Sequence, residues 1–152
     1  MLGTEKLQEL LDRFAAANGL PPIQADSMGH FRIRFDFRNA FDLVALDTQT
    51  VLIKSNIRLL AEFDPETAED IVHRCLQFGM TRIQEFAETL TYDAPSQQLI
   101  LYRLLDLATL DDAILEQAIE DFMNSISAWK AFVQQTLEPL QSPEPIPWNE
   151  RP

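Results

Sequence analysis

His73 and Cys75 are the two residues of the chain that come nearest to a catalytic pair. A histidine beside a cysteine can accept the thiol proton and so produce a thiolate nucleophile. Both residues lie in a segment with helical periodicity, where two positions differ by about 200° around the helix axis. Their side chains therefore point in opposite directions. We interpret Cys75 as a small core residue and His73 as an exposed helix residue.

The other patterns that support catalysis or cofactor binding are missing from the sequence. The four glycines, at positions 3, 19, 29 and 79, are too scattered to form a phosphate-binding loop. The two histidines and one cysteine have no metal-ligand spacing. Asp36 and Asp42 flank a predicted hairpin, but we interpret them as solubilising charges at strand ends rather than as a catalytic carboxylate pair. We therefore expect no cofactor, no metal and no enzymatic activity.

Length and charge narrow the remaining functions. The chain has 152 residues, 46% of them apolar, which is enough for the core of one domain. Its formal net charge of −12 argues against general binding to nucleic acid or to an anionic membrane surface. The sequence lacks a run of about twenty apolar residues, and it begins without the pattern of a signal peptide. We expect a soluble protein of a reducing cytoplasm.

The first half of the chain predicts one helix and a strand meander. Apolar residues at helical spacing predict a helix over residues 4–18, which ends at Gly19 before two prolines. Alternation of apolar and charged residues predicts a strand over residues 30–38. Short polar turns connect it to strands over 41–46 and 51–54, so the three strands should pair in antiparallel fashion.

The second half predicts a helix, a strand pair and a long final helix. The helix over residues 64–79 is predicted to start at Asp64, Pro65 and Glu66 and to end at Gly79. Strands follow over 86–92 and 97–106, although helical spacing also fits residues 80–91. The strand over 97–106 is apolar on both faces, which is typical of a strand covered on both sides. The last helix spans about 111–137 and has a narrow apolar seam at Leu115, Ile119, Phe122, Ile126, Trp129 and Val133.

These elements predict a two-layer α+β domain with the order α-β-β-β-α-β-β-α. An antiparallel sheet should carry the helices mainly on one side. The domain should span residues 1–138. Five prolines in the last fourteen residues indicate that residues 139–152 form an extended, flexible tail.

Apolar and basic surfaces are the features that point to binding. Phe31, Ile33, Phe35 and Phe37 form an apolar face that is either core or an open groove. The opposite face, with Arg32, Arg34 and Arg38, would pair with an acidic partner or with the chain's own Asp36 and Asp42. The helix over 64–79 and the strand over 97–106 have more apolar surface than three helices can cover, which favours a homodimer.

The element order and several short motifs resemble the class I type III secretion chaperones, the Tir chaperone (CesT-like) family. The resemblance covers about residues 7–133 and is carried by pattern rather than by invariant residues. The turn at residues 94–97 lacks the glycine often found there, and the proline-rich tail is not shared. The similar stretches are residues 10–14 (LLDRF), 18–21 (NGLP), 90–93 (LTYD), 99–102 (LILY), 107–112 (LATLDD) and 129–133 (WKAFV).

The resemblance implies a bacterial cytoplasmic homodimer that binds the N-terminal segment of a secreted effector in extended form. The complex would keep the effector soluble and release it to the secretion ATPase, with no nucleotide bound by the chaperone. The alternative is a regulatory or sequestering module that binds a folded partner outside secretion. We assign effector binding to Leu10, Phe14, Phe31, Ile33, Phe35, Arg32 and Arg34, and the dimer interface to Ile71, Cys75, Phe78, Phe86 and Leu90.

Overall fold

The fold comes from a computed structural model, which describes residues 2–82 and 87–141. The predicted order of helices and strands is confirmed. It runs α1 (Leu2–Ala17), β1 (His30–Arg34), β2 (Ala40–Ala45), β3 (Thr50–Leu59), α2 (Pro65–Arg82), β4 (Thr89–Asp93), β5 (Gln98–Asp106) and α3 (Asp112–Gln141).

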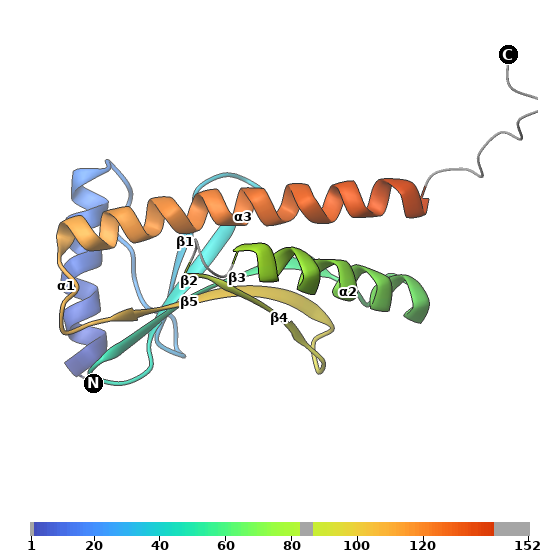
Figure 1. The fold of residues 1–152 in the computed structure, drawn as a ribbon. Helices are drawn as coiled ribbons and strands as arrows, with labels where there is room; N and C mark the ends of the chain where they lie inside the picture. The colour runs from blue at the N-terminus through green and yellow to red at the C-terminus, as the bar shows by residue number, and fades with distance from the viewer. Residues whose placement is uncertain (1, 83–86, 142–152) are drawn as a thin grey trace, which may run out of the picture.

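The five strands form one antiparallel sheet with the order β1-β2-β3-β5-β4. The first three strands make the predicted meander. The helices form a second layer on one face of this sheet, and α3 runs the length of that layer (Figure 1). It crosses α1 near its own N-terminus and lies beside α2 farther along (Figure 1). The expected two-layer α+β fold is therefore confirmed, with β1 and β4 as its two edges.

The seam of α3 holds the two layers together. All six predicted seam residues are buried. Phe122 contacts Phe41 of β2 edge-to-face, with ring centroids 5.9 Å apart. About two turns later, Trp129 contacts Phe78 of α2 in the same way at 4.9 Å. Because the same face of α3 contacts both the sheet and α2, it fixes how these two elements lie relative to each other.

The predicted end of α1 and the predicted start of α2 are confirmed, and local hydrogen bonds explain both. Gly19 has a φ of 65°, and the Leu20 N–H donates to the Ala15 carbonyl, which closes α1 with a Schellman motif. Asp64 caps α2 by accepting the Thr67 N–H at 2.8 Å, and this hydrogen bond helps to lower the pKa of that carboxyl. Gly79 does not end α2, because its backbone is not left-handed and the helix continues to Arg82.

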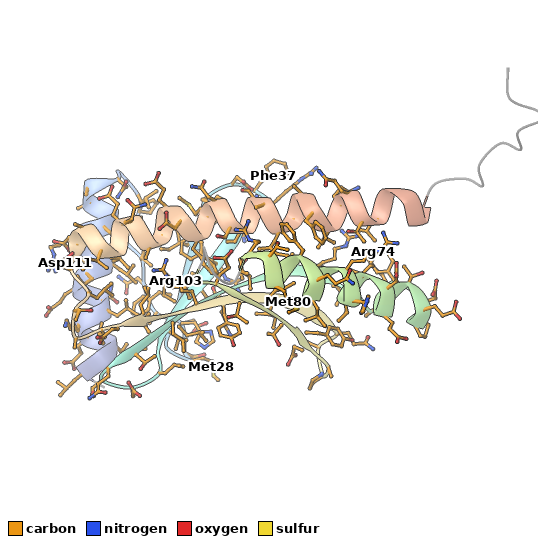
Figure 2. All side chains as sticks on the ribbon, in the orientation of Figure 1. Met28, Phe37, Arg74, Met80, Arg103 and Asp111 are labelled. Atoms are coloured by element: carbon orange, nitrogen blue, oxygen red, sulfur yellow. The ribbon has the colours of Figure 1, made fainter. Side chains whose placement is uncertain are left out.

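Other predicted boundaries, and one predicted environment, are also wrong. The first strand ends at Arg34, because the Asp36 carboxylate accepts the N–H groups of Arg38 and Asn39 and bends the chain into a turn. Phe37 is consequently 80% exposed and projects outward (Figure 2). The strand expected over 86–92 starts at Thr89, and residues 83–86 lie outside the described residues.

The other corrections concern the third and fifth strands and the last helix. β3 reaches Leu59, well beyond the predicted end. α3 continues to Gln141, into the segment expected to be tail. The helices cover only one face of β5, so Leu104 on its other face is 54% exposed and the strand is not covered on both sides. No helix in residues 2–82 or 87–141 is long and apolar enough to cross a membrane.

The burial of the α3 seam predicts unequal effects of the same substitution at two phenylalanines. Phe122→Ala should lower the free energy of unfolding by about 3–5 kcal/mol, because it leaves a cavity between α3 and the sheet. Phe37→Ala should change it by less than about 0.5 kcal/mol, because that ring is mostly in solvent. Urea denaturation of both variants tests this, and similar costs at the two positions would contradict the described packing.

Candidate protein-binding surfaces

Most of the apolar residues assigned to an open effector groove belong to the core. Leu10 is 3% exposed, Phe31 is 0% and Ile33 is 6%, because the helix layer covers this face of the sheet. The expectation that these three line a groove open to solvent is wrong. Phe14 and Phe35 are half-buried at the rim of the core, where the Phe35 ring lies 6.0 Å from that of Phe41.

Two of the residues assigned to the dimer interface are also buried inside the protomer. Ile71 is 0% exposed and Cys75 is 1% exposed, so the expectation that they face a second copy is wrong. Burial raises the pKa of the Cys75 thiol to about 12, which keeps it protonated at neutral pH and unsuited to be a nucleophile. Phe78 is half-buried and stacks on Phe132 at 4.2 Å. Phe86 lies outside the described residues.

An exposed apolar groove lies next to these buried residues, between α2 and the edge strand β4. Val72, Leu76 and Met80 follow one another at four-residue spacing on α2, and Leu76 and Met80 are 56% and 76% exposed. Leu90 and Tyr92 face them from β4. We call these five residues the α2–β4 groove. One hollow of about 200 Å³ adjoins Leu76, Met80 and Leu90, and another of about 380 Å³ adjoins Val72 and Tyr92.

A buried ion pair holds the two sides of this groove together. The Arg82 guanidinium at the end of α2 donates to the Glu88 carboxylate just before β4, over 2.8 and 3.0 Å. The sequence contained a signal for the groove, since the apolar face of α2 is wider than its core contacts require. Periodicity did not reveal which part of that face the other helices cover.

The predicted basic patch lines a hollow of about 450 Å³ beside β1, β2 and β3, which residues from both faces of the sheet and Lys130 of α3 border. Cations come to it from β1, from the turn that follows, from β3 and from α3. One histidine and five of the chain's twelve lysines and arginines line it. We call this site the basic hollow, and its basic residues are His30, Arg32, Arg34, Arg38, Lys54 and Lys130.

The chain's own carboxylates neutralise only part of the basic hollow. Asp42 pairs with Arg32 through two hydrogen bonds, of 2.9 and 3.2 Å. Asp36 is occupied by its own turn, where it also binds the Asn39 amide at 2.7 Å. The two aspartates therefore have separate structural partners and do not form a catalytic pair. The basic face was expected to pair either with an acidic partner or with the chain's own aspartates. For Arg32, the second alternative is correct, because it pairs with Asp42.

Comparisons with known proteins agree with this architecture. The model of the Tir chaperone protein (CesT) family matches residues 9–130, which is most of the chain. A search of curated protein sequences finds no significant match. Three solved structures with the same fold share only 14–21% sequence identity with this chain, so they are informative about the fold rather than about individual residues.

Several solved structures of protein complexes share this fold. The ExsC–ExsE complex matches with a TM-score of 0.72 and 21% identity, over 88% of this chain and 97% of the other. The HopA1–SchA chaperone–effector complex matches with a TM-score of 0.69 and 16% identity, over 86% of this chain and 98% of the other. A third match is the Yersinia pestis type III secretion chaperone SycH in complex with a stable fragment of YscM2. Its TM-score is 0.59 and its sequence identity is 14%, over 80% of this chain and 98% of the other. Together with the family match, this fold shows that the chain belongs to the Tir chaperone (CesT) family of type III secretion chaperones.

Proposed function

We propose that the protein is a bacterial cytoplasmic chaperone that binds the N-terminal segment of a type III secreted effector in extended form. The family match over residues 9–130 is the observation that carries this proposal. Similarity to solved complexes of chaperones with secreted partners supports it. The bound segment would stay soluble and competent for secretion, and handover to the secretion ATPase would follow. The task needs a binding surface and no catalysis.

The edge strand β1 suits an extended client. A client strand that pairs with a sheet edge gains main-chain hydrogen bonds, while its alternate side chains occupy pockets on the two faces. Among the described residues, the segment before β1 pairs with this edge at one bridge, Ala25 to Phe31. Phe35 supplies half-buried apolar surface directly after β1, Phe14 supplies half-buried apolar surface on α1, and Arg32 and Arg34 are exposed on the helix-free face. These four residues remain our candidates for effector contacts.

The α2–β4 groove suits a second copy of the chain. Its exposed residues are apolar side chains from two elements, which a monomer would leave in water. The groove lies at the opposite edge of the sheet from β1, so a partner there leaves the proposed client edge free. We therefore propose a homodimer that buries Leu76, Met80, Leu90 and Tyr92, with Phe78 behind them. This moves the interface from the buried Ile71 and Cys75 to their exposed neighbours.

Leu76→Asp should separate the dimer into monomers, because an unpaired carboxylate at an apolar interface is costly. Sedimentation equilibrium should give twice the 17.4 kDa of one chain for the unmodified protein and the single mass for the variant. Leu104→Asp is the matched control, since Leu104 is 54% exposed against 56% for Leu76 but lies on the helix-free face. Monomers of the unmodified protein, or dissociation by the control alone, would contradict the proposed interface.

Capture of the natural client tests the chaperone role. The tagged full-length protein should retain a secreted effector from the source bacterium, and limited proteolysis of the complex should protect that effector's N-terminal segment. The segment alone should show no cooperative unfolding, because it has no core of its own. Recovery of a folded partner with no link to secretion would instead support the regulatory alternative.

A further inference from the structure

The basic hollow concentrates positive charge in an acidic chain. Arg34, Arg38 and Lys54 have no ion-pair partner among the side chains of residues 2–82 and 87–137. Asp42 is the only carboxylate in the lining, and cross-strand register places it between Arg32 on one side and Lys54 on the other. The lining therefore retains uncompensated positive charge in a protein whose formal net charge is −12.

We propose that the basic hollow binds acidic side chains at alternate positions of the extended client segment. This inference rests on the proposed function and adds the chemistry by which the client is recognised. A strand added beside β1 would place every second side chain on the helix-free face, next to Arg32 and Arg34. Acidic residues at those positions would complement the hollow, and the intervening residues would face the apolar rim near Phe35.

The geometry favours a peptide over the other anionic partners. The hollow is local, and the acidic remainder of the surface repels a long polyanion such as a nucleic acid. A second copy bound at the α2–β4 groove lies at the other edge of the sheet, so it leaves the hollow open. Lys130 adds a half-buried ammonium group, whose pKa is lowered by desolvation while the nearby Asp36 carboxylate opposes part of that shift.

Peptide binding to the full-length protein tests this inference directly. The probes are fluorescein-labelled peptides in which valine alternates with glutamate or with glutamine. By fluorescence anisotropy, the glutamate peptide should bind about tenfold more tightly than the glutamine peptide at about 50 mM NaCl, and this preference should shrink at about 500 mM. Equal affinities, or tighter binding of a labelled single-stranded DNA, would overturn the inference.

Matched variants locate the effect. The double variant Arg34→Gln with Lys54→Gln should abolish the preference for glutamate and keep binding of the glutamine peptide. Arg13→Gln with Arg74→Gln removes the same charge from α1 and α2 and should keep the preference. A preference that survives the first pair, or is lost equally with the second, would overturn the inference.

The outcome is separable from that of the proposed function. If an effector is captured but glutamate is not preferred, the chaperone role stands and the basic hollow is not the recognition site. If glutamate is preferred through Arg34 and Lys54 but the captured partner is a folded protein outside secretion, the hollow binds acidic chains while the proposed client is wrong.

Discussion

The packing of the α3 seam is the contact on which the rest of the structure depends. Five strands and two shorter helices cannot enclose a core by themselves, because a sheet buries its apolar face only when another layer covers it. The long helix supplies that layer, and its aromatic contacts reach β2 at Phe122 and α2 at Trp129. Removing either ring opens the space between two elements rather than loosening one side chain.

Coverage of a single face determines where binding can occur. Most apolar residues between the sheet and the helices are used for folding, which is why Phe31, Ile33, Ile71 and Cys75 are absent from the surface. The edges of the sheet, its helix-free face and the outer stripe of α2 remain available. The two candidate surfaces lie in these places, the α2–β4 groove at one edge and the basic hollow beside the other.

The sequence predicted the elements well and their surroundings less well, for a physical reason. Periodicity and capping are local, so residues 64–67 and 115–133 were enough to locate the start of α2 and the seam of α3. Burial depends on which element covers a face, and the apolar pattern of Ile33 or Cys75 is the same whether the cover is the chain itself or a partner. Phe37 was misplaced because a side-chain carboxylate, that of Asp36, interrupted the strand alternation.

The cations that line the basic hollow repel one another in the free protein. Several cations held near one another repel, and β1, β3 and α3 fix their backbones, so they cannot disperse fully. Asp42, set between Arg32 and Lys54, relieves part of this repulsion. In the proposed binding mode, an anionic client segment would relieve the remainder. That interaction would be sensitive to salt, which would let a client held along the edge be released.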